Sequence, residues 1–220
     1  MTAVNIKTIM TKKTPDKIDL YKQHKNEYAA PRKPVFVETK PALYLAISGQ
    51  GAPGGEQFTA SIGALYGAAF TIKMTRKFAG QQDYAVCKLE GQWWSDSGND
   101  LSKAPKDQWH WNLLIRTPGF VTAEELQKAV AVLIKRGKGQ EVKRVRLESL
   151  AEGSCVQMLH VGPYDQECLT IARMKEFAAT NQREFHGRHH EIYLSDPRRR
   201  VPPERLKTLL RCPVRPQSRL

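Results

Sequence analysis

The stretch "PALYLAISGQG" (residues 41–51), followed by "EQFTASIGALYGAAFTIKMTRKF" (residues 56–78), decides the fold. The first stretch alternates apolar and polar residues, which predicts a β-strand. The second repeats its apolar residues at helical spacing, which predicts a helix packed along one face. Two more strands are predicted after this helix, at 83–94 and 108–118. The apolar stripe of the helix consists of Phe58, Ile62, Leu65, Tyr66 and Ala69.

The same order of elements recurs in the second half of the chain. A strand, a helix and two further strands are predicted at 154–164, 165–181, 189–197 and 205–215. Between the halves, residues 121–137 predict one more helix, because Thr122 and Glu125 have the spacing of a capping box and Gly137 provides a stop. One side of the second-half helix carries Thr170, Ile171, Met174, Phe177 and Ala178.

This repetition predicts an α+β fold built from duplicated β-α-β-β units with pseudo-twofold symmetry. Repeat one covers about 35–120 and repeat two about 121–220. We expect two antiparallel sheets, each backed by a helix, whose uncovered faces meet across a central groove. Such a groove is a typical place for a ligand.

The remaining chain and the composition narrow the class of protein. Residues 1–34 are rich in lysine, so we expect a basic leader with a short helix around 19–28. The 35 Lys and Arg residues against 22 Asp and Glu give a net charge of +13, which favours encounters with anionic partners. Neither a secretion signal, a membrane-spanning run nor a zinc or disulfide spacing is visible. We therefore predict a cytoplasmic protein with no membrane contact, and the oligomeric state stays open.

Glu191 is an acid in a strand, "HHEIYLSDP" (residues 189–197), that otherwise looks built to be buried. Because neighbouring side chains on a strand point to opposite faces, Glu191 and Tyr193 share one face and Ile192 lies on the other. We expect the helix on the Ile192 face and Glu191 in the groove, where aromatic rings would make it a proton donor, a proton acceptor or a cation anchor. The alternative is a salt bridge on a solvated face with Arg188, Arg198 or Arg199.

Five stretches carry a resemblance to a known family: "KLEGQWW" (88–94), "WHWNLLIRTPGFVT" (109–122), "MLHVGPYDQE" (158–167), "HHEIYLSDPRR" (189–199) and "PPERLKTLLRCPV" (202–214). With them the chain resembles the GyrI-like small-molecule-binding family over nearly its whole length. The resemblance implies the same duplicated architecture and a central groove for hydrophobic aromatic or cationic small molecules. It also implies that Glu191 is the anchoring acid.

Some stand-alone members that the chain resembles are cyclopropanoid hydrolases, which add water to the strained ring of genotoxic compounds. The resemblance therefore implies an enzyme of detoxification or antibiotic resistance, with Glu191 as a catalytic residue. Opening such a ring needs a base for the water and a donor to the carbonyl oxygen. Glu191 and Tyr193 could fill these roles, with Tyr164 as a second hydroxyl. The expected ligand-binding residues are Trp93, Trp111, Tyr164, His160 and Tyr66.

Two other function classes stay open. The chain could bind or sequester a drug without catalysis, or act as a gyrase-inhibitor-like protein through its basic surface. A DNA-binding regulator is disfavoured because no helix-turn-helix is visible, so nucleic acid is not expected as a specific partner. For His160, a histidine that is packed and hydrogen-bonded beside the groove is the alternative to a ligand contact.

Several motifs point to less specific roles. "GQGAPG" (residues 49–54) has the spacing of a dinucleotide fingerprint, but two strands follow its helix and no acid follows at the required distance, so we expect a turn at the groove mouth. No cofactor and no metal are expected, because His190 and Glu191 face opposite ways. Glu90 is either a partner of Lys88 or a second groove acid. Trp93 opposes Trp94, so one of the two must leave the core.

Overall fold

The computed structural model describes residues 16–98, 101, 104–195 and 201–217. Arg198 and Arg199, which we considered as partners of Glu191, lie outside the described residues. Within the described ranges, no helix combines the length and the apolar character needed to cross a membrane.

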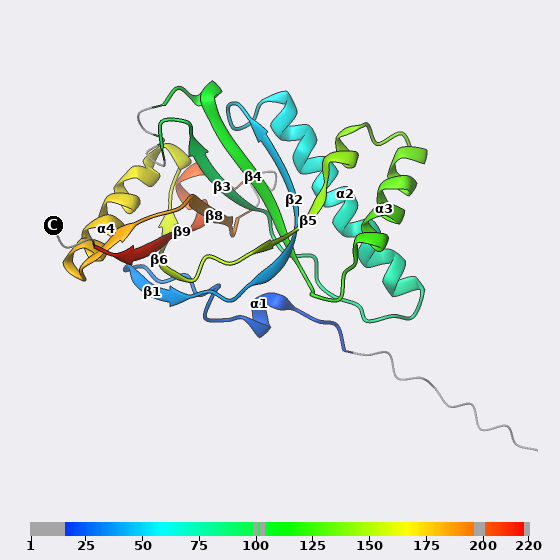
Figure 1. Cartoon of the computed structure of the whole chain (residues 1–220), viewed down its shortest axis with the longest axis horizontal. Helices are drawn as coiled ribbons and strands as arrows, with labels where there is room; N and C mark the ends of the chain where they lie inside the picture. The colour runs from blue at the N-terminus through cyan, green and yellow to red at the C-terminus, as the bar shows by residue number, and fades with distance from the viewer. Residues whose placement is uncertain (1–15, 99–100, 102–103, 196–200, 218–220) are drawn as a thin grey trace, which may run out of the picture.

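Nine strands of the described chain form one antiparallel sheet (Figure 1). Eight of them follow one another in the order β1-β6-β9-β8-β3-β4-β2-β5, and β7 pairs with β9. The strands are β1 (Val35–Glu38), β2 (Ala42–Gln50), β3 (Glu90–Ser95), β4 (Trp109–Thr117), β5 (Arg146–Leu150), β6 (Ser154–Val161), β7 (Arg183–Phe185), β8 (His189–Tyr193) and β9 (Lys207–Pro216).

The duplicated units are confirmed, and they meet in the middle of this sheet. One unit is β2-α2-β3-β4 and the other is β6-α4-β8-β9. Their strands lie in the order β2-β4-β3 and β6-β9-β8 from the outside inwards, which is the arrangement that a pseudo-twofold axis between β3 and β8 produces. The expectation of two sheets facing each other was wrong. Because β3 pairs with β8, the two units join edge to edge into a single sheet.

The outermost strands are exchanged between the units. β1, which precedes the first unit, pairs with β6 of the second unit. β5, which precedes the second unit, pairs with β2 of the first. Each half of the sheet is therefore completed by a strand from the other half of the chain.

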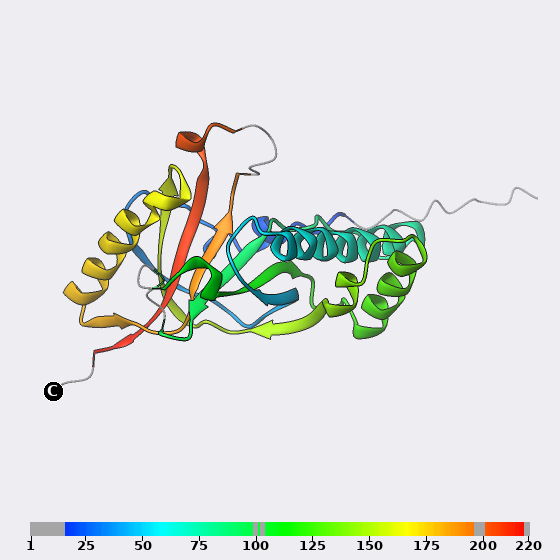
Figure 2. The same cartoon turned by 90° about the horizontal axis from the view of Figure 1, so that it is seen from above.

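Both repeat helices pack on the same face of the sheet, at its two ends (Figures 1 and 2). Residues directly opposite in an antiparallel pair share a face. Across β2, β4, β3, β8 and β9 the register aligns Ile47, Leu113, Gly91, Glu191 and Leu210 in one row. Ile47 belongs to the core under α2, and Leu210 belongs to the core under α4. Glu191 thus lies on the helix-covered face, between the two helices.

The third helix, α3, lies beside α2 and begins with the predicted capping box, in which Thr122 accepts from the Glu125 backbone N–H and the Glu125 side chain accepts from the Thr122 backbone N–H. Within the described residues the α-helices are α1 (Leu20–Gln23), α2 (Glu56–Phe78), α3 (Ala123–Lys135) and α4 (Glu167–Thr180), with short 3-10 turns η2 (Lys106–Gln108), η3 (Glu141–Arg144), η4 (Tyr164–Gln166) and η6 (Pro203–Arg205).

The N-terminal segment, which we expected to be a leader, covers the other face of the central strands from residue 16 onwards. Asp19 caps the short helix α1. Tyr28 packs against Ile192 and Leu209 in a small buried cluster. The prediction that a helix would cover the Ile192 face was therefore wrong: this segment takes that place.

Ionisable side chains are buried beneath the N-terminal segment. His190 is fully buried, with Nε2 3.1 Å from Glu90 Oε2 and Nδ1 2.9 Å from Glu152 Oε2. Burial would lower the pKa of His190, but the carboxylates of Glu152 and Glu90 raise it to about 9. Burial alone would raise the pKa of the Glu152 carboxyl group, whereas the neighbouring His190 and Arg211 lower this pKa to about 2. A protonated His190 brings the cluster to three cations and three carboxylates: Arg116, His190, Arg211, Glu27, Glu90 and Glu152.

This cluster predicts how stability depends on pH. Because the pKa of His190 rises from 6.5 to about 9 on folding, its protonation stabilises the fold fully below about pH 6.5, and this contribution is lost as the pH rises through about 9. Glu152 adds stability above its ordinary pKa of 4.5, which is lost as the pH falls through about 2. We expect the free energy of urea unfolding to decrease from about pH 7 to about pH 9.5. His190→Gln should lower stability at neutral pH and flatten this slope; an equally steep slope in the variant would contradict the assignment.

Candidate functional site

A cavity of about 900 Å³ lies on the helix-covered face, between α2 and the central strands β3 and β8. Its size is within the range of small-molecule sites. Five of the residues predicted to act on or bind a ligand line it: Tyr66, Trp93, Tyr164, Glu191 and Tyr193. The rest of the lining consists of Pro53, Gly54, Phe58, Ile62, Phe70, Val86, Cys87, Lys88, Leu89, Trp109, Leu194, Ser195 and Val201.

One wall of the cavity is a stripe of large apolar side chains on α2. Phe58, Ile62, Tyr66 and Phe70 are spaced four residues apart and therefore lie on one side of the helix. At 1.5 Å per residue the stripe is ~18 Å long. The Phe58 ring is stacked 5.6 Å from the Trp93 ring, so the aromatic surface continues from the helix onto the sheet. This wall suits an elongated, flat ligand.

The floor of the cavity combines an acid, a phenol and an indole. Trp93 Nε1 donates a hydrogen bond to the Tyr193 hydroxyl oxygen at 3.2 Å. Burial and the neighbouring Glu191 carboxylate raise the pKa of Tyr193 well above its ordinary value, so its hydroxyl keeps its proton. That oxygen accepts from Trp93, and the hydroxyl hydrogen is donated to the Glu191 carboxylate, so the indole, the phenol and the acid form one hydrogen-bonded chain.

A second carboxyl group, which we did not predict, lies beside Glu191. Glu167 is the first residue of α4 and is 6% exposed. Burial and the charge of Glu191 raise the pKa of Glu167 well above its ordinary value. A protonated Glu167 can donate a hydrogen bond to the Glu191 carboxylate, so the two acids share one proton. No sequence signal marked Glu167, because only the packing of α4 on β6 and β9 brings its first residue beside Glu191.

His189 completes a group of three potential ligand atoms at this place. Its Nε2 lies 3.3 Å from Glu191 Oε1, and the ligand atoms of Glu167, His189 and Glu191 are all within 4.8 Å of one another. His189 and Glu191 are two residues apart on the strand and therefore share a face. The expectation of no metal site compared Glu191 only with its neighbour His190. Among the described residues, these three are therefore the ones that could hold a metal ion.

The comparison with protein families gives this arrangement a context. The sequence profile of the GyrI-like small molecule binding domain matches residues 32–215. The chain belongs to the GyrI-like family. Its large cavity is therefore the candidate ligand site of a small-molecule-binding domain. None of the curated proteins matches the chain.

Solved structures of GyrI-like proteins resemble the whole domain. An uncharacterized conserved protein from Listeria innocua is 40% identical, covers 90% of this chain and 100% of its own length, and superimposes with a TM-score of 0.84. A hydrolase from the same organism, encoded by lin2189, is 39% identical over 91% of this chain and 100% of its own, with a TM-score of 0.83. The C-terminal domain of EcmrR is 9% identical over 84% of this chain and 98% of its own, with a TM-score of 0.54, and shares the fold alone.

Two residues that we expected in the GyrI-like cavity lie elsewhere. Trp111 is fully buried in the core, where its ring lies against Gly49. A Cβ on Gly49 would come within 2.3 Å of that ring, so the glycine provides the space that removes Trp111 from the cavity. His160 bonds through Nδ1 to Thr170 Oγ1 at 2.9 Å and through Nε2 to the Pro163 carbonyl at 3.1 Å. It is the packed histidine that we named as the alternative.

The other motifs of the GyrI-like chain also find their places. Glu90 is neither a partner of Lys88 nor a groove acid, because it is fully buried on the opposite face and accepts from the Tyr28 hydroxyl at 3.0 Å. Trp94 leaves the core, as one of the two neighbouring tryptophans had to, and Arg188 stacks over its ring at 3.6 Å. The "GQGAPG" segment contributes Pro53 and Gly54 to the cavity lining, in agreement with a turn at the mouth.

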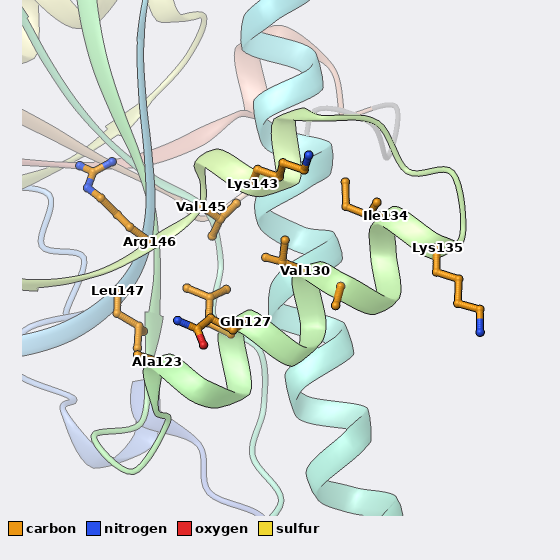
Figure 3. Close-up of a pocket in the computed structure, with 11 residues that line it drawn as sticks. Ala123, Gln127, Val130, Ile134, Lys135, Lys143, Val145, Arg146 and Leu147 are labelled. Carbon is orange, nitrogen blue, oxygen red and sulfur yellow. The ribbon is translucent and has the colours of Figure 1, made fainter.

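A second hollow, of about 740 Å³, lies between α3 and β5 (Figure 3). Apolar side chains of α3, such as Val130 and Ile134, face Val145 and Leu147 across it. Its charged residues are Lys135, Lys143 and Arg146, and it contains no acid or histidine among its lining residues. It lacks the acid–phenol pair of the large cavity, which is therefore the candidate site.

Proposed function

We propose that this GyrI-like protein is a hydrolase that adds water to the strained ring of cyclopropanoid or similarly electrophilic genotoxic compounds. One observation carries the proposal: Glu191 and Tyr193 lie side by side on the floor of a large aromatic cavity. The hydrolase from Listeria innocua, which is 39% identical over full length, supports an enzyme rather than a binding protein. All four cysteines are free, which suits a protein that acts in the reducing cytoplasm. There the reaction would protect the cell from the compound.

The residues of the floor suit each part of such a reaction. Glu191 takes a proton from a water molecule whose oxygen forms a bond to the ring carbon. In a substrate whose cyclopropane ring is conjugated to a dienone, the ring C–C bond then breaks. Its electron pair moves into the dienone, and the carbonyl oxygen of the dienone becomes a phenolate. When Glu191 has taken the proton of the water and lost its charge, the Tyr193 hydroxyl turns from Glu191 to the substrate oxygen and donates to it as its charge develops. Trp93 and Trp109, whose rings are 6.1 Å apart, together with Phe58 hold the flat part of the substrate.

The second candidate is a binding protein for hydrophobic aromatic cations, and the paired acids favour it. A cation placed over the aromatic rings could replace the proton that Glu167 and Glu191 share. Such a ligand would be held tightly without being changed. The two functions therefore differ in the fate of the ligand and not in the shape of the site.

Turnover separates these functions. We expect the protein to convert a cyclopropane-bearing DNA alkylator into a product that is heavier by one water molecule, at least a hundredfold faster than buffer does. Mass spectrometry after liquid chromatography follows the product, and heat-denatured protein is the control. If the alkylator binds but is recovered unchanged, the hydrolase proposal fails and the binding protein is supported.

A further inference from the structure

Beneath Trp93 and Tyr193 of the cavity floor, β3 contains a glycine that the backbone does not require. Gly91 is buried in β3, directly opposite Glu191 of β8. Its φ is not in the left-handed region that favours glycine. A glycine in the interior of a strand weakens it, because the residue has more freedom to lose and no side chain to pack. The reason for a glycine here must therefore lie in the space above it.

That space is filled by two polar atoms of the site. A Cβ on Gly91 would lie 3.1 Å from the Tyr193 hydroxyl oxygen and 3.1 Å from Trp93 Nε1, closer than ordinary contacts of 3.4–4 Å. The same two atoms form the hydrogen bond of 3.2 Å across the floor. This distance is already at the long end for an N–H···O bond. A side chain that displaced either atom by a few tenths of an ångström would break it.

We propose that Gly91 is a positioning residue: its missing side chain lets the Tyr193 hydroxyl lie over β3, where Trp93 fixes it beside Glu191. The hydroxyl oxygen is then occupied by the indole N–H, and the hydroxyl hydrogen is directed to the Glu191 carboxylate. Gly91 touches no substrate in this arrangement and acts through Tyr193. The activity test below rests on the proposed hydrolase function, whereas the spectroscopic test does not.

A double-mutant cycle tests whether Gly91 acts through the hydroxyl. Gly91→Ala should lower kcat/KM for the cyclopropane substrate about tenfold, and Tyr193→Phe about a hundredfold. The double variant should be no slower than Tyr193→Phe alone, within about twofold, because the hydroxyl through which the new methyl group would act is already absent and only the contact with Trp93 remains. Gly91→Ala should also lower the melting temperature less in the Tyr193→Phe background than in the wild type, because one of the two close contacts is gone. Independent, additive losses in activity or in melting temperature would overturn the proposal.

Fluorine NMR provides a readout that does not depend on turnover. The protein has four tryptophans, so uniform labelling with 5-fluorotryptophan gives four resonances, which Trp→Phe variants assign. We expect the Trp93 resonance alone to move in Gly91→Ala and again in Tyr193→Phe. Gly63→Ala is the control, because a Cβ there has nothing within 4 Å and should move no resonance. If Gly91→Ala leaves Trp93 unmoved, the proposal fails even when the enzyme is active; if the wild type shows no turnover, this measurement still decides it.

Discussion

Glu191→Gln is expected to slow cyclopropane opening by about a thousandfold while ligand affinity stays within about threefold. The amide has nearly the shape of the carboxylate but cannot take a proton from water. The aromatic walls that hold the ligand, among them Phe58 and Trp93, are left intact. Single-turnover rates by mass spectrometry and ligand quenching of tryptophan fluorescence measure the two quantities separately.

Two other glutamates serve as controls for this result. Glu184 forms a surface ion pair with Arg215 at 2.7 Å, so Glu184→Gln should retain full activity. Glu167 holds a proton beside Glu191, and an amide also donates a hydrogen bond, so Glu167→Gln should cost only about tenfold. Wild-type turnover by Glu191→Gln would remove Glu191 from the chemistry and leave the cavity as a binding site.

Tyr28→Ala is expected to lower the free energy of unfolding by about 3–5 kcal/mol, which makes it the largest stability effect that we expect from a single substitution. The ring packs against Ile192 and Leu209 and is 8% exposed. Its hydroxyl donates to the buried Glu90 carboxylate at 3.0 Å. The substitution removes both the packing and the donor, and chemical denaturation followed by circular dichroism measures the loss.

Two further aromatic substitutions identify the source of this loss. Tyr28→Phe keeps the ring and removes only the hydroxyl, so about 1–3 kcal/mol should be lost. Phe78→Ala removes an aromatic ring that is 80% exposed, and the change should be about 0.5 kcal/mol or less. If Tyr28→Ala costs no more than Phe78→Ala, the N-terminal segment contributes nothing to the stability of the sheet.

Local patterns explain why much of the fold could be predicted. The helical stripe through Phe58, Ile62 and Tyr66 and the capping box at Thr122 depend on residues close together in the chain, and the structure contains both elements. The alternation of the strand around Glu191 also fixed its face relative to Ile192. The resemblance to the GyrI-like family indicated which of the two faces would carry the ligand.

What the sequence concealed is the pairing of distant segments. Nothing local distinguishes two sheets in contact from one sheet joined at β3 and β8, because the same alternation serves both. The place of Trp111 depends on the missing side chain of Gly49, which lies in another strand. Glu167 becomes part of the site only when α4 packs on β6 and β9. The N-terminal segment was predicted to be only a basic leader because it is rich in lysine and weakly apolar, although its Tyr28 proves to be buried.

The exchange of β1 and β5 between the two units ties the cavity to the integrity of the entire chain. A fragment that ends before β5 would leave β2 with an unpaired edge and would leave β3 without β8, so half of the cavity floor would be missing. Neither duplicated half alone therefore contains the whole cavity floor. Ligand affinity and folding cooperativity both depend on the pairing of β3 with β8 and on the exchanged strands. A chain divided between the two units should lose both.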